Sequence, residues 1–223
     1  MWVVLLHKAV AFLRLHLAFS RQYGDYQLLF ANPVLSCHFT FPCFSPSLQT
    51  GFLPNVFKVL SHRPLEFRAF FAYYNVICNK KTGQLSRADK ELIILVTSLG
   101  NRCSYSVVVH SAWYRVFSKN PVLSDQVCIN WRKSDLPARE KAMLEFALAI
   151  SQADDITDDH FKKLEVHGFN QEDAWDIAAI SAFYAMSNRL AHFVSLVPKK
   201  EFYLMGRTND VKDIRSEPAA PEI

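Results

Sequence analysis

Three residues near the middle of the chain, Cys103, Ser106 and His110, are spaced as one stripe along a helix. The first two are three positions apart and the last two are four apart, so all three side chains share a helical face. If Asn101 caps this helix, Cys103 falls in its first turn, where the helix dipole and unpaired backbone N–H groups favour a thiolate. The stripe could therefore hold a nucleophilic thiol, with Ser106 or a water carrying protons to the imidazole, because two helical turns separate Cys103 from His110.

Glu91 is the fourth candidate, because it stands in a segment that is otherwise almost wholly apolar. A carboxylate in such a helix is expected to have a partner, and His110 on the next, antiparallel helix is the candidate. Purely structural roles remain open, since lone cysteines and histidines in helices are usually packed core groups. A serine hydrolase is disfavoured by the absence of a Gly-x-Ser-x-Gly elbow. Metal binding is disfavoured because Cys103 and His110 lack further ligands at suitable spacing, and no cofactor is expected.

Helices must position these residues, because apolar side chains recur every three or four positions from about residue 51 onward. Prolines fall where first helical turns are expected, and glycines fall at element boundaries. No stretch alternates apolar and polar residues as a half-buried strand would. The fold class is therefore predicted to be all-α. Asn188, in the last long helix, is expected to cap or pair with a neighbouring element.

The chain of 223 residues carries 25 basic and 21 acidic side chains, a net charge of +4, and 50% of it is apolar. The whole excess lies within residues 1–65, so the remainder is neutral and a nucleic-acid-binding function is disfavoured. Lys8 and Arg14 interrupt the one apolar run that approaches the length of a membrane span, so no span is expected. Five cysteines, an odd number without framework spacing, favour a reducing compartment.

Three parts are predicted along the chain. Residues 1–50 form an irregular N-terminal extension, residues 51–207 a helical domain, and residues 208–223 a disordered tail. Residues 1–24 contain no acidic side chain, a feature of mitochondrial transit peptides. A targeting segment followed by a Pro-rich linker, a plain extension and a wrongly assigned start all remain open. The expected location is cytoplasmic or mitochondrial.

The same residues carry a resemblance to a known family. The matching text comprises Gly51–Phe57, Ser61–Pro64, Leu85–Ile93 and Asn101–Ser106, followed by His110. In these segments the chain resembles the alkylhydroperoxidase AhpD / carboxymuconolactone decarboxylase superfamily, in its peroxidase-related branch. The family motif is a Glu twelve positions ahead of Cys-x-x-Cys-x-x-x-His. The resemblance implies an all-α AhpD-like bundle, a trimer or hexamer, and a Glu–His relay that activates a cysteine to reduce hydroperoxides.

Ser106 departs from that motif, since it stands where the family has the cysteine that attacks the peroxide. Cys103 matches the cysteine that closes the disulfide. A hydroxyl is a poor nucleophile toward an O–O bond, and one thiol cannot form a Cys-x-x-Cys disulfide, so the two-thiol cycle cannot run. Three hypotheses stay open. The first is an antioxidant one-cysteine hydroperoxide reductase that uses Cys103, His110, Glu91 and Ser106 with an external thiol reductant. The second is a non-catalytic helical oligomer. The third is a carboxymuconolactone-decarboxylase-like acid–base enzyme that uses Glu91 and His110.

Overall fold

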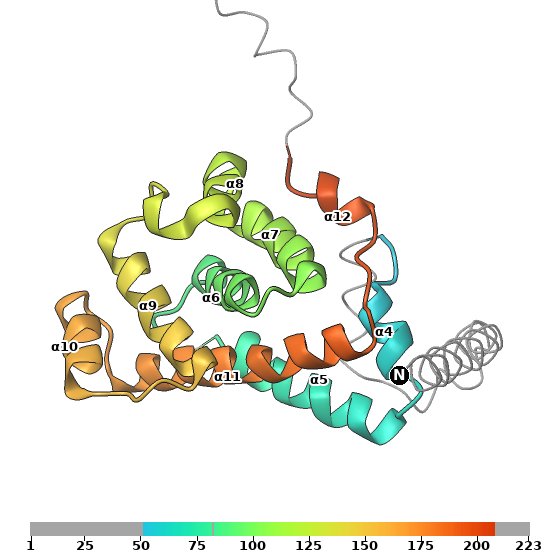
Figure 1. The fold of residues 1–223 in the computed structure, drawn as a ribbon, viewed down its shortest axis with the longest axis horizontal. Helices are drawn as coiled ribbons and strands as arrows, with labels where there is room; N and C mark the ends of the chain where they lie inside the picture. Colours follow the sequence, from blue (N-terminus) through green and yellow to red (C-terminus); the bar gives the residue numbers. More distant parts are fainter. Residues whose placement is uncertain (1–50, 82, 208–223) are drawn as a thin grey trace, which may run out of the picture. The chain divides into compact units, whose positions relative to one another are not determined.

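The computed structural model describes residues 51–81 and 83–207. The chain divides into two compact units, Met1–Leu53 and Pro54–Ile223, and nearly all described residues belong to the second. The predicted extension and the predicted tail lie outside the described residues. The helices are α4 (Asn55–Leu60), α5 (Pro64–Cys78), α6 (Arg87–Gly100), α7 (Ser104–Ser118), α8 (Pro121–Asn130), the 3-10 turn η2 (Trp131–Lys133), α9 (Ala138–Gln152), α10 (Asp158–Val166), α11 (Gln171–Phe193) and α12 (Glu201–Leu204) (Figure 1).

The described part of the chain contains helices and turns but no strand, which confirms the predicted all-α class. Among these helices, none combines the length and the apolar character that crossing a membrane requires. The starts of α6 and α11 are capping boxes, formed by Ser86 with Asp89 and by Asn170 with Asp173. In each, the side chain of one residue accepts from the backbone N–H of the other, so free donors at the helix start are satisfied.

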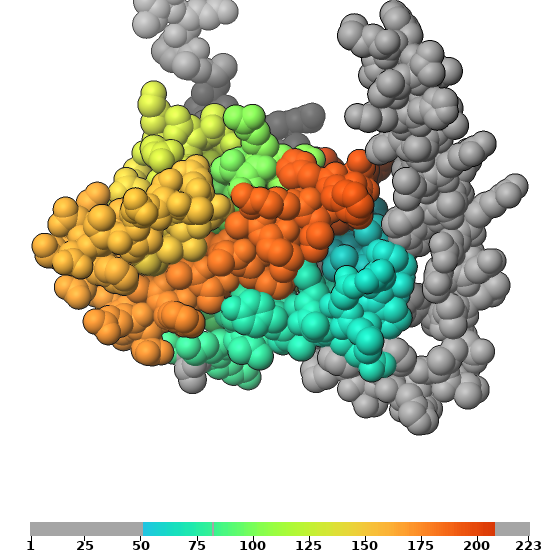
Figure 2. Space-filling model, turned by 60° about the horizontal axis from the view of Figure 1, so that its bottom comes forward, coloured from blue at the N-terminus to red at the C-terminus, as the bar shows by residue number. Residues whose placement is uncertain are grey.

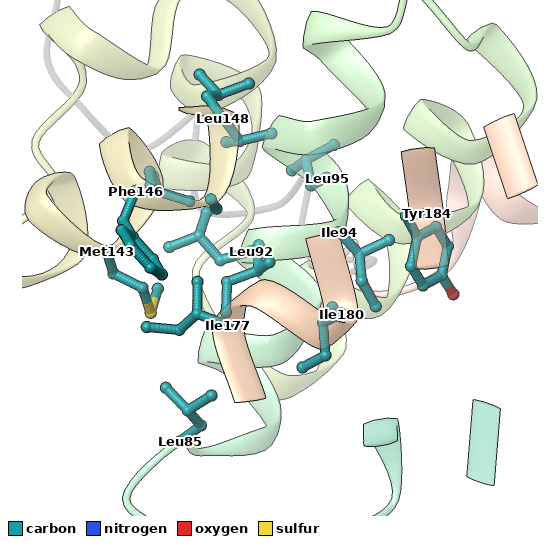
Figure 3. Packing of buried hydrophobic residues seen from close by; sticks show 14 of the residues in the cluster. Leu85, Leu92, Ile94, Leu95, Met143, Phe146, Leu148, Ile177, Ile180 and Tyr184 are labelled. Atoms are coloured by element: carbon teal, nitrogen blue, oxygen red, sulfur yellow. The ribbon is translucent and has the colours of Figure 1, made fainter. Parts of the chain in front are cut away.

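Helix α6 is the central element, and α7, α9 and α11 pack around it (Figure 1). Every residue from 91 to 98 is buried, including the polar ones. Apolar side chains of α6, α9 and α11 converge on one core, in which Leu92, Met143 and Ile177 are at most 1% exposed (Figure 3). Burying side chains of this size contributes about 1.5–3 kcal/mol each. Helix α5 packs against α11, and the two helices lie side by side at the surface seen in Figure 2.

The turn between α6 and α7 differs from the sequence-based expectation. Asn101 does not cap α7; it ends α6, and Cys103 is itself the N-cap residue of α7. The reason is that Arg102 adopts a left-handed conformation, φ 56°, and closes α6 with a C-terminal motif in which Cys103 N donates to Ser98 O at 2.9 Å. The thiol therefore belongs to the junction of the two helices, one residue before the first turn of α7.

Gly100 is the last residue of α6, at an element boundary as predicted for the glycines, but the left-handed position is taken by Arg102. A Cβ at Gly100 would lie 2.7 Å from the Leu148 side chain, so the glycine permits close approach of α9 to the end of α6.

Candidate active site

The predicted pairing of Glu91 with His110 is present. Glu91 lies in the first half of α6 and His110 in the middle of α7, and the two side chains meet in the interior. His110 Nδ1 and Glu91 Oε2 are 2.7 Å apart, and the residues are only 8% and 3% exposed. Since the carboxylate can only accept, Nδ1 is the donor, and Nε2 is the ring nitrogen left for proton exchange.

Cys103 and Ser106 form the second pair. The Cys103 thiol donates to Ser106 Oγ at 3.5 Å, and both side chains are buried, with Cys103 2% exposed. Within the described part of the chain, no hydrogen bond joins this pair to the Glu91–His110 pair. The structure therefore brings the four predicted residues together as two adjacent pairs on α6 and α7, and proton exchange between the pairs requires a small rearrangement, a water or a substrate group.

Two tyrosines pack beside these pairs. Tyr184 of α11 packs edge-on against the His110 ring, with centroids 4.9 Å apart and planes at 87°. Tyr105 follows the thiol on α7, and its hydroxyl accepts from Val56 N at 3.3 Å. Burial raises the pKa of both tyrosines, so each remains protonated at neutral pH. The sequence did not indicate Tyr184 as a site residue, because it lies far from His110 along the chain and in an apolar helix, where an aromatic residue is an ordinary core group.

The three cysteines among the described residues are all free thiols, but their surroundings differ. Burial, together with the charge of Glu91, raises the pKa of the Cys78 thiol on α5. Burial and then the charge of Asp125 raise the pKa of the Cys128 thiol on α8. Both are therefore held as unreactive thiols at neutral pH. Cys103 differs from both in its place, since it is the N-cap residue of α7, and the Ser106 hydroxyl lies 3.5 Å from its sulfur.

No cluster of three or more side chains able to hold a metal ion occurs among the described residues. Asn188 meets its expectation of a partner, since it hydrogen-bonds both Ser98 and Asn101 at the α6–α7 turn. Sequence analysis did not connect this asparagine with the candidate site.

Among known proteins, this chain is similar to several solved structures. No protein-family model matches the chain, and no curated protein matches it at the significance required. An uncharacterized peroxidase-related protein with the alkylhydroperoxidase AhpD core, from Ralstonia eutropha JMP134, is 46% identical over 74% of this chain and 87% of its own, with a TM-score of 0.71. A second peroxidase-related protein, from Silicibacter sp. TM1040, is 34% identical over 72% of this chain and 84% of its own, with a TM-score of 0.69.

A third solved structure, a putative antioxidant defence protein AhpD of unknown function from Agrobacterium tumefaciens, is 26% identical. It aligns with 62% of this chain and 92% of its own, with a TM-score of 0.50. The identity to the Ralstonia protein, the coverage and the shared helical fold agree with the resemblance carried by Glu91, Cys103 and His110. The chain belongs to the AhpD-like, peroxidase-related family.

Proposed function

We propose that the protein is a one-cysteine, thiol-dependent hydroperoxide reductase. The observation that carries the proposal is the adjacency of the Cys103–Ser106 and Glu91–His110 pairs, with sulfur 3.5 Å from the hydroxyl and imidazole 2.7 Å from the carboxylate. Family membership supports the same chemistry. Ser106 takes the place of a second thiol, so the cycle needs an external one.

In the first step the Cys103 proton leaves through Ser106 toward His110, and Glu91 stabilises the imidazolium that forms. The thiolate attacks the terminal oxygen of a hydroperoxide, a sulfur–oxygen bond forms and the O–O bond breaks. Sulfur is oxidised to sulfenic acid, and the departing alkoxide takes a proton from His110 and leaves as the alcohol.

In the second step an external thiol attacks the sulfenic acid, releases water and leaves a mixed disulfide on Cys103. A further thiol attacks this disulfide, regenerates the Cys103 thiol and leaves as the oxidised reductant. One hydroperoxide is thereby reduced for two external thiols oxidised.

The experiment that tests this function is brief exposure of the reduced protein to a hydroperoxide, with mass spectrometric location of sulfenic acid by residue. The proposal expects sulfenic acid at Cys103 before any at Cys78 or Cys128, and loss of peroxide consumption in Cys103→Ser. Equal oxidation of the three thiols, or turnover that survives in Cys103→Ser, would overturn it.

A non-catalytic helical oligomer is the second candidate, favoured by one observation: Cys103 is only 2% exposed.

Assembly is proposed in both cases, as a trimer or hexamer of identical chains. Exposed apolar residues lie along one side of α11 and suit such an interface: Trp175, Met186, Leu190 and Phe193. Light scattering tests the assembly, and Phe193→Glu is expected to lower the measured mass. A monomeric mass for the unaltered protein would contradict it.

A further inference from the structure

Asn188, a completely buried residue of α11, connects the two sides of the turn that carries Cys103. Its Nδ2 donates to Ser98 Oγ at 3.2 Å, and its Oδ1 accepts from Asn101 Nδ2 at 3.1 Å. The backbone oxygen of Ser98 in turn accepts from Cys103 N at 2.9 Å. A buried amide left unpaired is costly, so these bonds define one arrangement of Ser98, Asn101 and Cys103.

The turn requires this support because of Arg102, which has φ 56° although it is not a glycine. Such a conformation persists only where the surroundings hold it. Asn101, the residue before it, is fixed in place by two further hydrogen bonds, and these stabilise the turn. Its Nδ2 also donates to Ser151 Oγ on α9 at 3.0 Å, and its carbonyl oxygen accepts from His192 Nε2 on α11 at 3.0 Å.

Tyr184 lies one helical turn before Asn188, so both side chains project from the same face of α11. Its ring meets His110 edge-on, at 4.9 Å between centroids and 87° between planes. An aromatic edge in this position restricts rotation of the imidazole, whose Nδ1 is already bonded to Glu91. One face of α11 thus contacts the imidazole of the site and holds the turn of the thiol.

From these contacts we infer that α11 is the positioning element of the candidate site. Asn188 sets the place of Cys103 through the α6–α7 turn, and Tyr184 sets the orientation of His110. Both are positioning residues, because each acts through another side chain. The inference rests on the proposed function in taking Cys103 and His110 as the reacting pair.

The test begins with the rate of sulfenic acid formation at Cys103 in Asn188→Leu, which keeps the branched shape of the side chain and removes both hydrogen bonds. We expect the rate to fall about ten- to a hundredfold, as displacement of a reacting group by an ångström does. Asn188→Asp keeps the acceptor for Asn101 and is expected to restore part of the rate. Asn120→Ala removes the N-cap bond of α8 and is the control for general destabilisation, with the rate expected unchanged.

A second measurement needs no turnover: the nitrogen NMR signals of the His110 imidazole. Tyr184→Leu is expected to shift these signals, and Tyr184→Phe, which keeps the ring, to leave them near their original positions. If neither the Cys103 rate nor the His110 signals change more than in Asn120→Ala, the inference is wrong. If the unaltered protein forms no sulfenic acid but Tyr184→Leu still shifts the His110 signals, the proposed function fails and the positioning role of α11 stands.

Discussion

Glu91 Oε2 accepts a hydrogen bond from His110 Nδ1 at 2.7 Å, between two side chains that are almost fully excluded from solvent. Because the carboxylate occupies Nδ1, Nε2 is the ring nitrogen left to exchange a proton with Ser106, a water or a substrate. One ring nitrogen is thus bonded to the carboxylate, and the other is available for a proton from the Cys103–Ser106 pair. This arrangement suits a proton-transfer role for His110 better than a role in which it only neutralises the buried charge of Glu91.

The first prediction concerns Glu91→Gln, which keeps the shape of the side chain and removes its charge. We expect sulfenic acid formation at Cys103 to slow about a hundredfold, because an imidazolium formed during proton transfer loses its counter-charge. The rate is followed by mass spectrometry after peroxide addition. Glu66→Gln is the control, since Glu66 pairs with Arg63 at the surface. Equal rates in the two variants would mean that the Glu91–His110 pair is structural only.

The second prediction concerns Ser106→Cys, which places a thiol where the Cys103 sulfur already contacts a side chain at 3.5 Å. Oxidation is expected to join the two sulfurs, with a mass loss of two hydrogens and protection of both from alkylation. Peroxide consumption supported by a dithiol reductant should rise. Ser118→Cys, roughly three turns beyond Ser106 along α7, is the control and should form no bond with Cys103. A Ser106→Cys protein that keeps both thiols free after oxidation would contradict the geometry.

The third prediction concerns pH and the ion pair of Asp125 with Arg207, whose two N–O distances are 2.9 Å. Hydrogen bonding from Arg207 lowers the pKa of Asp125 below its ordinary value of 3.8. The carboxylate therefore stabilises the fold at pH values above 3.8, and this contribution is lost as the pH falls through the lowered pKa. Both side chains are partly exposed, so the contribution is at most about 1 kcal/mol.

Asp125→Asn should accordingly lower the melting temperature slightly at about pH 6, and the difference from the unaltered protein should vanish in acid. Calorimetry across this range measures it. Asp155→Asn, at an exposed carboxylate without an ion pair to any described residue, should show no such dependence. A difference that persists undiminished well below pH 3.8 would contradict the assignment.

Local sequence patterns predicted the parts of the site that depend on neighbours along the chain. The i,i+3 contact of Cys103 with Ser106 needs only helical spacing. The Glu91–His110 pair was also predictable, because a carboxylate in an apolar helix needs a partner and the next helix offered one.

The junction at Cys103 was not predictable in the same way. Asparagine suits both ends of a helix, so Asn101 alone could not decide between capping α7 and ending α6. Contacts from distant elements decided it: Ser151 on α9 and Asn188 on α11 engage the Asn101 side chain. With Asn101 held there, Arg102 adopts the left-handed conformation that sequence propensity would give to a glycine.

The last prediction concerns Gly206, which follows α12 and has φ 73°. A Cβ there would lie 2.8 Å from Arg115 Cβ and 3.0 Å from Val116 N. The buried Arg115 guanidinium donates to the oxygens of Phe202 and Met205, so Gly206 lies where this segment is bonded to α7. Gly206→Ala would therefore push the segment away from the bonds that hold it.

Gly168→Ala is the matched control, because Gly168 has φ 84° but no atom within 4 Å of the added Cβ. Both variants incur the left-handed backbone cost of about 1–2 kcal/mol, and only Gly206→Ala adds a steric clash, worth about 1–3 kcal/mol more. Denaturant unfolding of the two variants measures the difference directly. Gly206→Ala should lose more stability than Gly168→Ala. Equal losses in the two variants would show that the segment after α12 does not pack on Arg115.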